Sequence, residues 1–437
     1  MYNLQGRAIC GRLSTEKGKP VKISAKLLAS DAQSENSGCF LPIESNISQS
    51  LSGKSVVTLD DISTAQIRML LDKARYIDSH RKEVAHTCDG RLLATLFYEP
   101  STRTRLSFET AMLRLGGKVI GFAGAGLSSA SKGETVSDTL KVVSNYVDVV
   151  AMRHPKEGAA FVATQAVNTP IINAGDGGHM HPTQTLADLA TILERFGRLN
   201  NLTVGLCGDL TYGRTVHSLI ETLCRFGNVH FVLISPDELK TPQYVIDRIK
   251  DTPSCTYEET RDLMKVIGEL DVLYMTRVQE ERFTDRDQYL RLRDTYILTE
   301  EKLNKAKPNT AVLHPLPRIN EISVDVDCDS RAAYFDQVKN GMLMRMALES
   351  SVLGDELDGY EPTDFVRVPL EENESKDANG ISLSLPRIHN NDMNAPKNMT
   401  CSNPRCITNS ELTLVKKFYK SESGMHEYHC LYCDNKA

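Results

Sequence analysis

The chain of 437 residues is 41% apolar and 25% charged, with a net charge of −6 and a pI near 6.0. This length suffices for two or three domains, and the acidic balance argues against a nucleic-acid binder, whose footprint is a basic excess. No run of about 18 apolar residues and no apolar segment behind a basic start occurs, so we expect neither a membrane span nor a secretory signal. The eleven cysteines favour a reducing cytoplasm, because only the four within residues 401–433 are clustered.

Residues 1–50 are polar and rich in serine, without a sustained period of 2 or 3.6, and we interpret them as an N-terminal extension. An Asp/Ser cap at Asp60 then leads into an amphipathic segment. Its apolar residues recur at the spacing of one helix face: Ile67, Leu70, Leu71, Ala74 and Ile77.

Strand-like and helix-like segments then alternate, which predicts parallel sheets covered by helices. The first series comprises Leu92–Tyr98, a helix from Thr104, Lys118–Phe122, a helix from Glu134, Val147–Met152, a helix near Ala159, Pro170–Asn173 and a helix over Thr183–Phe196. The second comprises Leu202–Cys207, a helix over Thr215–Phe226, Val229–Ile234, a helix near Tyr244–Ile249, Val272–Met275 and Thr310–Leu313. After the second series, an apolar helix is expected over Gly341–Leu353, which returns to complete the first domain.

The predicted fold class is therefore α/β, with two doubly wound parallel-sheet domains and a small C-terminal metal domain. We expect the boundaries to be 51–196 with the closing helix 341–354, 197–340, a polar linker over 355–397, and 398–437.

Polar clusters follow six of the predicted strands, where ligands bind in open parallel sheets. They are Ser101–Arg105, Met152–Pro155, Asn173–Thr185, Cys207–Thr215, Met275–Gln279 and Leu313–Arg318. In the first cluster, hydroxyls and an arginine meet the unpaired N–H groups of a helix start, which favours phosphate over an ordinary N-cap. Arg103, Arg153, Arg214 and Arg277, with His181, predict a pocket for a strongly anionic ligand.

These motifs together resemble the catalytic chain of the aspartate carbamoyltransferases over residues 51–354. The segments that carry the resemblance are Phe97–Arg105, Met152–Pro155, His181–Gln184, Gly208–Ser218 and His314–Arg318. The resemblance implies transfer of a carbamoyl group from carbamoyl phosphate to the amine of L-aspartate, a step of pyrimidine biosynthesis that needs no catalytic cofactor.

The resemblance also implies roles on the carbamoyl phosphate side of the site. The phosphate-binding loop would be Ser101, Thr102, Arg103 and Thr104. Arg153 would bridge the phosphate and the carbonyl, while His181 and Gln184 would lie at the carbamoyl group.

On the aspartate side, the resemblance implies Arg214, Arg277 and Gln279, with the backbone carbonyl of the Leu316–Pro317 loop facing the incoming amine. Ser128 and Lys132 match a loop that the family inserts into a neighbouring subunit's site, so a homotrimer or a dimer of trimers is expected.

The implied catalytic set is Arg103, Thr104, Lys132, Arg153 and His181. Orientation and electrostatics should supply most of the acceleration, and the departing phosphate is the hypothesised proton acceptor.

Two alternatives to this activity share part of the pattern. Ornithine carbamoyltransferases share the phosphate side, but their pattern has a cysteine in the loop that here reads His314–Pro317. A non-catalytic, phosphate-sensing paralogue is the second alternative, although the set of donors is intact.

The C-terminal cysteines form two close pairs, at Cys401 and Cys406 and at Cys430 and Cys433, the arrangement of a tetrahedral zinc site. Four thiolates leave no open position, so the zinc should be structural; His426 and His429 are rival ligands.

The spacing resembles the zinc domain of the aspartate carbamoyltransferase regulatory chain, here fused in cis. The nucleotide-binding domain that precedes it in that family is missing from residues 355–397. We therefore expect the zinc domain to dock on the catalytic part and support assembly without ATP or CTP control.

Overall fold

The computed structural model describes residues 50–278, 285–367, 391–393, 395–396, 398–411, 413–420 and 428–437. The N-terminal extension, most of the predicted linker, Gln279 and His426 lie outside these ranges. The described residues belong to one compact unit.

The first domain is built on a parallel sheet with the strand order β2-β1-β3-β4. Its strands are β1 (Leu92–Phe97), β2 (Lys118–Phe122), β3 (Val149–His154) and β4 (Ile171–Asp176). Its helices are α2 (Thr64–Ser79), α3 (Thr102–Arg114), α4 (Val136–Val143), α5 (Ala159–Ala166), α6 (Pro182–Phe196) and the late helix α12 (Asp336–Leu353).

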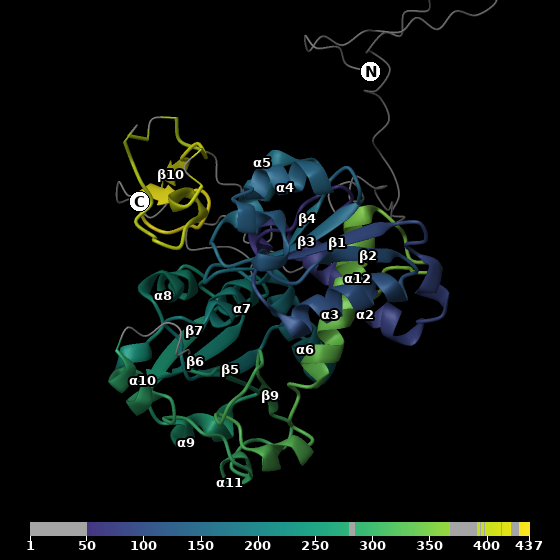
Figure 1. Cartoon of the computed structure of the whole chain (residues 1–437). Coiled ribbons are helices and arrows are strands. Elements are labelled where there is room, and N and C mark those ends of the chain that lie inside the picture. The colour runs from purple at the N-terminus through teal and green to yellow at the C-terminus, as the bar shows by residue number, and fades with distance from the viewer. Residues whose placement is uncertain are drawn as a thin grey trace, which may run out of the picture. The chain divides into compact units, whose positions relative to one another are not determined.

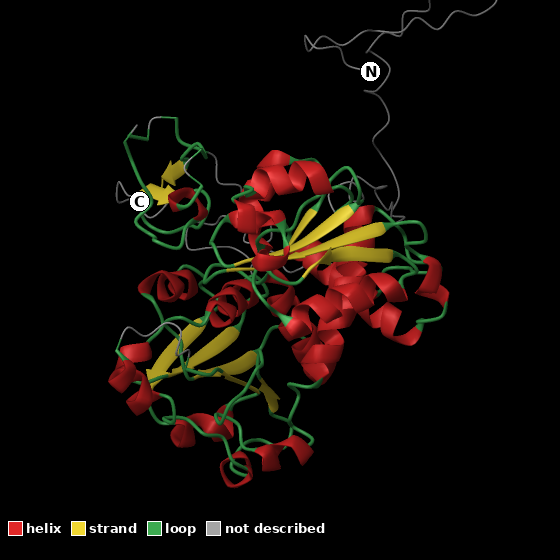
Figure 2. Cartoon of the chain, viewed as in Figure 1, coloured by secondary structure: helices red, strands yellow, loops and turns green. Residues whose placement is uncertain are grey.

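Alternate residues of each strand pack on opposite faces of this sheet. In β1, Leu93 and Phe97 belong to a cluster with α2, α3, α6 and α12, whereas Ala94 and Leu96 belong to a cluster with α4 and α5. Helices therefore cover both faces (Figures 1 and 2), which explains why the interior strand β1 is almost wholly apolar.

The second domain has a parallel sheet with the order β7-β6-β5-β8-β9. Its strands are β5 (Leu202–Cys207), β6 (Val229–Ile234), β7 (Thr256–Thr260), β8 (Val272–Met275) and β9 (Ala311–Leu313). Its helices are α7 (Arg214–Cys224), α8 (Gln243–Lys250), α9 (Leu263–Val266), α10 (Arg286–Leu292) and α11 (Glu300–Leu303), while α13 (Asp364–Arg367) follows α12.

In each sheet the strand that comes first in the sequence lies in the interior. The chain adds the next strands on one side of it and then crosses over to add the remaining strands on the other side. Such a switch point opens a crevice beyond the carboxyl ends of neighbouring strands. In the first domain the strands that flank it are β1 and β3, which pair at Phe97 and Arg153. This register brings the Ser101–Arg105 cluster beside Arg153.

The α/β fold class predicted from the sequence is confirmed, and several local expectations need correction. The closing helix α12 begins at Asp336 rather than at Gly341. The first helix begins after Ser63, whose side chain caps Gln66, rather than at Asp60, which lies in a 3-10 turn. The second predicted strand series lacked β7, because this edge strand is polar and largely exposed, so it carries no apolar signal. β3 extends to His154, so Arg153 belongs to the strand itself.

The C-terminal segment has a two-stranded antiparallel sheet, β10 (Phe418–Lys420) with β11 (Tyr428–Cys430). Its apolar residues share one buried cluster with α4 and α5. The Tyr432 ring, for example, meets the Phe161 ring edge-on at 5.5 Å. Across the ranges that the structure describes, no helix combines the length and apolar character needed to cross a bilayer.

Candidate active site

A cavity of about 390 Å³ is lined by residues of both α/β domains. Of the predicted site residues, ten line it: Ser101, Thr102, Arg103, Thr104, Arg153, His181, Gln184, Arg214, Leu316 and Pro317. The clusters predicted at separate strand ends therefore converge on one space.

The start of α3 supplies hydrogen-bond donors to this cavity. Ser101 is the N-cap residue, yet its hydroxyl makes no capping hydrogen bond. The first backbone–backbone bond of the helix comes from Arg105 N to Ser101 O, at 3.1 Å. The preceding N–H groups have no partner within the helix, so they and the hydroxyls are available to an anion.

Arg153 and Arg214 approach each other over Gly175. A Cβ on this glycine would lie 2.9 Å from Nη1 of Arg153 and 3.5 Å from Nη2 of Arg214, and its φ of +121° also favours glycine. Burial lowers the pKa of Arg214 to about 10, with a further contribution from the charge of Arg153. Two guanidinium groups are thus held together, and an anion between them would relieve their repulsion.

His181 lines the cavity from the N-cap position of α6. Burial, followed by the charges of Arg214 and Arg153, holds its pKa well below the usual range, so the ring is neutral at pH 7. Its Nδ1 atom is buried and has no hydrogen-bond partner among the described residues. A neutral ring can donate one hydrogen bond to a developing oxyanion while adding no charge.

Gln184 and the Leu316 loop are joined by a chain of buried hydrogen bonds through Asp188. Oδ1 of Asp188 accepts from Nε2 of Gln184 at 2.8 Å and from Nε2 of Gln337 at 2.7 Å. Oε1 of Gln337 accepts from the backbone N of His314 at 2.8 Å. Since the amide nitrogen of Gln184 is used, its oxygen Oε1 is oriented to accept from a carbamoyl NH₂ group.

The conformation of Leu316 depends on His314. Leu316 has a φ of +48°, and its N–H donates to Nδ1 of His314 at 2.8 Å. The other ring nitrogen, Nε2, lies 2.7 Å from Oε1 of Glu321, whose pKa is lowered despite burial by this contact. His314 therefore carries its proton on Nε2 and fixes the turn that presents the Leu316 carbonyl.

Arg345 on α12 lines the cavity but was not predicted from the sequence. It donates from Nη1 to Ser107 on α3 and from Nη2 to Thr183 on α6, each at 3.0 Å. The available signal was a single arginine inside the apolar run Gly341–Leu353. Burial lowers the pKa of Arg345 to about 10, which is still above 7, so the guanidinium stays charged at neutral pH and also favours an anionic ligand.

Four arginines line this cavity, namely Arg103, Arg153, Arg214 and Arg345, and within the described part of the chain no carboxylate does. Glu99 is paired with Arg153 at 3.3 Å but lies outside the lining. The cavity therefore fits ligands with several negative charges, and among the described residues it presents no carboxylate to pair with a cationic side chain.

Three predicted residues are not in this cavity. Ser128 and Lys132 line a separate cavity of about 530 Å³ beside α4. Arg277 follows β8 and is half-buried, but it is not among the lining residues.

The predicted metal cluster is brought together by the fold. The Sγ atoms of Cys401, Cys406, Cys430 and Cys433 are buried and lie within 4.8 Å of one another. Cys401 and Cys433 are 3.5 Å apart, and Cys406 and Cys430 are 3.8 Å apart. Tetrahedral Zn²⁺ with bonds of about 2.3 Å places sulfurs about 3.8 Å apart, so the four thiols fit one zinc ion. His429 instead has Nδ1 at 2.8 Å from the Asp434 carbonyl.

Three family models match successive parts of the chain. Residues 54–194 match "Aspartate/ornithine carbamoyltransferase, carbamoyl-P binding domain", and residues 200–352 match the Asp/Orn binding domain of the same family. Residues 397–437 match "Aspartate carbamoyltransferase regulatory chain, metal binding domain".

Similar proteins cover the same region. The aspartate carbamoyltransferase catalytic subunit of Bifidobacterium longum strain DJO10A is 80% identical over 310 residues, which is 71% of this chain and 97% of that subunit. The subunit of Clostridium novyi is 57% identical over 304 residues, or 70% of this chain and 99% of that subunit.

Two solved structures are similar in fold. The M. jannaschii catalytic subunit has a TM-score of 0.65 at 42% identity, covering 70% of this chain and all of that one (100%). The Trypanosoma cruzi aspartate transcarbamoylase, in complex with carbamoyl phosphate and aspartate, has a TM-score of 0.65 at 40% identity, covering 69% and 98%.

Proposed function

This chain belongs to the aspartate/ornithine carbamoyltransferase family, and we propose that it transfers the carbamoyl group of carbamoyl phosphate to L-aspartate. The products are N-carbamoyl-L-aspartate and phosphate, in de novo pyrimidine biosynthesis. The charge of the cavity carries the choice of aspartate over ornithine, because four arginines and no carboxylate of the described residues line it.

Carbamoyl phosphate would bind with its phosphate at the start of α3, where the N–H groups, the hydroxyls of Ser101, Thr102 and Thr104, and Arg103 offer donors. Its carbonyl oxygen would face Arg153 and neutral His181. As the amine attacks the carbon, negative charge grows on this oxygen, and the same donors stabilise it without moving.

Aspartate would enter from the side of Arg214, with its amine directed at the Leu316 carbonyl. That carbonyl can accept a hydrogen bond from the amine and align its lone pair with the carbamoyl carbon. The C–N bond forms as the C–O bond to phosphate breaks, and the departing phosphate takes the amine proton. Arg277 and Gln279 remain proposed contacts of the substrate carboxylates.

A side-by-side assay of carbamoyl transfer tests this proposal. With carbamoyl phosphate held constant, product should form with L-aspartate and not with L-ornithine. Transfer to ornithine at a similar rate would contradict the role given to the arginines, and failure with both would favour a phosphate-sensing paralogue.

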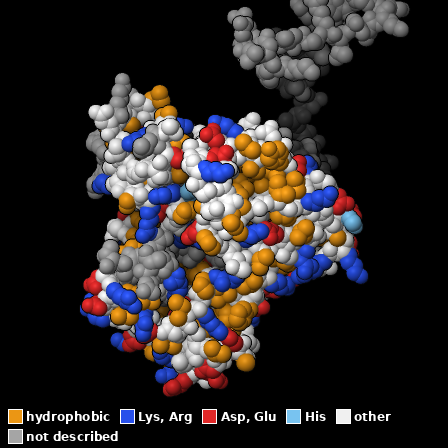
Figure 3. Space-filling view, viewed as in Figure 1, with side chains coloured by type: hydrophobic (Ala, Val, Ile, Leu, Met, Phe, Trp, Pro, Cys, Tyr) orange, Lys and Arg blue, Asp and Glu red, His pale blue; other side chains and the backbone are white. Residues whose placement is uncertain are grey.

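We also propose a homotrimer, alone or as a dimer of trimers, with each site shared between subunits. Two observations support it. Lys132 does not line the arginine-lined cavity of its own chain, and the separate cavity that it does line includes the exposed apolar side chains of Leu127 and Val142. Apolar groups gather over α4, β1 and β2 in Figure 3, as expected for a covered surface.

The four cysteines would hold a structural Zn²⁺, which needs no open coordination position. We propose that this domain supports assembly and carries no nucleotide control. CTP at millimolar concentration should leave aspartate saturation unchanged; a clear shift would overturn this part of the proposal.

A further inference from the structure

The segment that joins β4 to α6, residues 176–181, holds two groups of the cavity in place, and we call it the 176–181 loop. The carbonyl of Gly177 accepts a hydrogen bond from Nη1 of Arg214. His181, at the other end of the loop, lines the cavity. A shift of this loop would therefore move the partner of Arg214, and with it the aspartate side of the site.

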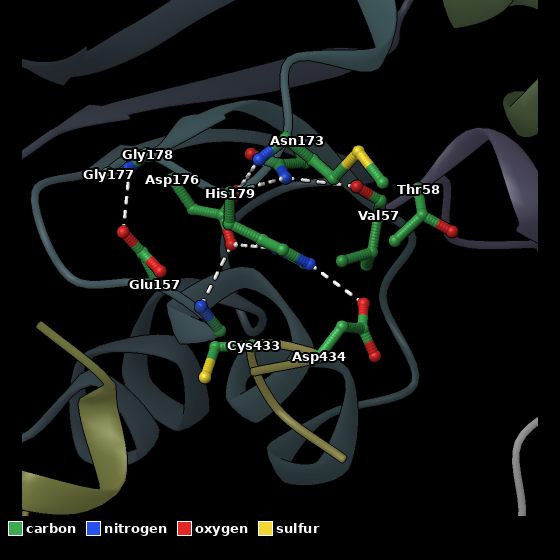
Figure 4. Close-up of polar contacts among 12 residues, drawn as sticks. Val57, Thr58, Glu157, Asn173, Asp176, Gly177, Gly178, His179, Cys433 and Asp434 are labelled. Carbon is green, nitrogen blue, oxygen red and sulfur yellow. Dashed lines mark hydrogen bonds and ion pairs between the residues drawn. The ribbon is translucent and has the colours of Figure 1, made fainter. Parts of the chain in front are cut away.

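The C-terminal domain contacts this loop through His179 (Figure 4). Nδ1 of His179 lies 3.0 Å from Oδ2 of Asp176, and Nε2 lies 2.9 Å from Oδ2 of Asp434. The His179 side chain is only 8% exposed, and these carboxylates hold its pKa well above the usual range although burial opposes this. The imidazolium thus bridges the loop and the residue next to the zinc ligand Cys433.

A second contact reaches the same loop through Glu157. Its Oε1 accepts from the backbone N of Gly178 at 3.0 Å, and its Oε2 accepts from Nδ2 of Asn403 at 2.5 Å. Asn403 also donates to the Sγ of Cys433 at 3.6 Å. Both contacts therefore start beside one metal-binding cysteine and end on adjacent residues of the 176–181 loop.

We propose that His179 and Glu157 are positioning residues, through which the docked zinc domain fixes the 176–181 loop and keeps Arg214 in place for the substrate. This inference rests on the proposed function. Its consequence is a coupling between two sites: zinc binding strengthens the binding of aspartate, and by thermodynamic reciprocity an aspartate-like ligand strengthens zinc retention.

The coupling can be measured as zinc release from the full chain. Release into a chromophoric chelator would be followed with and without N-(phosphonacetyl)-L-aspartate, which carries both the phosphonate and the aspartate carboxylates. The ligand should slow release about tenfold, the effect of one hydrogen bond to a charged group. In the His179→Ala variant the ligand should slow zinc release only slightly. The KM of this variant for aspartate should rise about tenfold, with a smaller change in kcat.

Matched variants distinguish loss of the contacts that position the 176–181 loop from a general weakening of the docking of the zinc domain. Lys417→Ala removes a docking contact to Gln165 on α5, at 3.1 Å and away from the loop, and should retain the ligand effect. Asp434→Asn keeps an acceptor oxygen for His179 and should retain more of the effect than Asp434→Ala, which also serves if His179→Ala folds poorly.

The possible outcomes show whether this inference fails or whether the proposed carbamoyl transfer, on which it rests, fails. If the wild type binds the ligand and zinc release is unchanged, or if Lys417→Ala loses the effect as fully as His179→Ala, the inference is overturned. If the wild type neither binds the ligand nor carbamoylates aspartate, the proposed function itself is overturned.

Discussion

Arg345 donates a hydrogen bond of 3.0 Å from Nη2 to the hydroxyl of Thr183, and its Nη1 donates to Ser107 at the same distance. One guanidinium on α12 therefore ties the first turn of α6, which follows His181, to the second turn of α3, which follows the phosphate-binding residues. Lysine carries its donors on one nitrogen, so it lacks the two separate donor nitrogens, held in a planar fork, that make these two bonds.

Arg345→Lys should lower kcat/KM for both substrates about 100-fold, which corresponds to about 2.7 kcal/mol of transition-state stabilisation. Steady-state kinetics would measure this loss. Arg105→Lys is the control, since Arg105 pairs with Glu109 on the same helix at 2.6 Å and does not line the cavity. Equal losses in the two variants would contradict a special role for Arg345.

Asp188 should make stability depend on pH. Burial raises its pKa from 3.8 to about 7, although three side-chain donors oppose this. The folded state then binds more protons than the unfolded state between about pH 4 and pH 7, so stability falls as pH rises across this window, by at most about 1.4 kcal/mol per pH unit.

Asp188→Asn removes this titration and keeps an acceptor for Gln184 and Gln337. The free energy of unfolding of the variant, relative to wild type, should therefore increase from pH 5 to pH 7, as measured by denaturant titration at each pH. A difference that stays constant with pH would show that Asp188 keeps an ordinary pKa.

Arg103→Ala and Lys132→Ala should each be nearly inactive alone and recover activity together. If Lys132 completes a neighbour's site, randomly mixed trimers contain about a quarter of sites with both residues intact. Activity after mixing, denaturing and reassembling the two variants would measure this. No recovery, with trimers verified by light scattering, would contradict a shared site.

Loss of the metal should expose α5. Cys401→Ser should remove zinc and release the C-terminal domain from its contact with Phe161 and neighbouring residues. Amide hydrogen exchange in α5 should then accelerate about tenfold or more. Cys328→Ser is the control because Cys328 is an exposed cysteine outside the cluster. Unchanged exchange in a zinc-free Cys401→Ser chain would contradict the dependence of docking on metal.

Much of the fold could be predicted because the strands are short apolar runs with polar residues at their carboxyl ends. β5, β6 and β8 match the predicted ranges residue by residue, since each is buried and bounded by turn residues. The exposed edge strand β7 could not be found in this way, because its residues face solvent and show no apolar period.

The candidate site was predictable where function is carried by motif residues at strand ends, as in Ser101–Thr104. Arg345, His179 and Glu157 were not found, because their importance comes from contacts between segments distant in sequence. His179, for instance, meets Asp434 across 255 positions. Local periodicity and spacing are visible in the sequence, whereas such pairings depend on how the domains dock.

The docking of the C-terminal domain on α4 and α5 occurs within one polypeptide. The C-terminal domain is thus always near its docking surface, because the two are covalently connected. Connections of this kind give an effective concentration of about millimolar order when they are short and flexible, however dilute the protein is. Dilution cannot separate the two, and every copy of the cavity is made with its own zinc domain in a one-to-one ratio. A separately encoded subunit would instead leave some copies unaccompanied whenever its supply fell short.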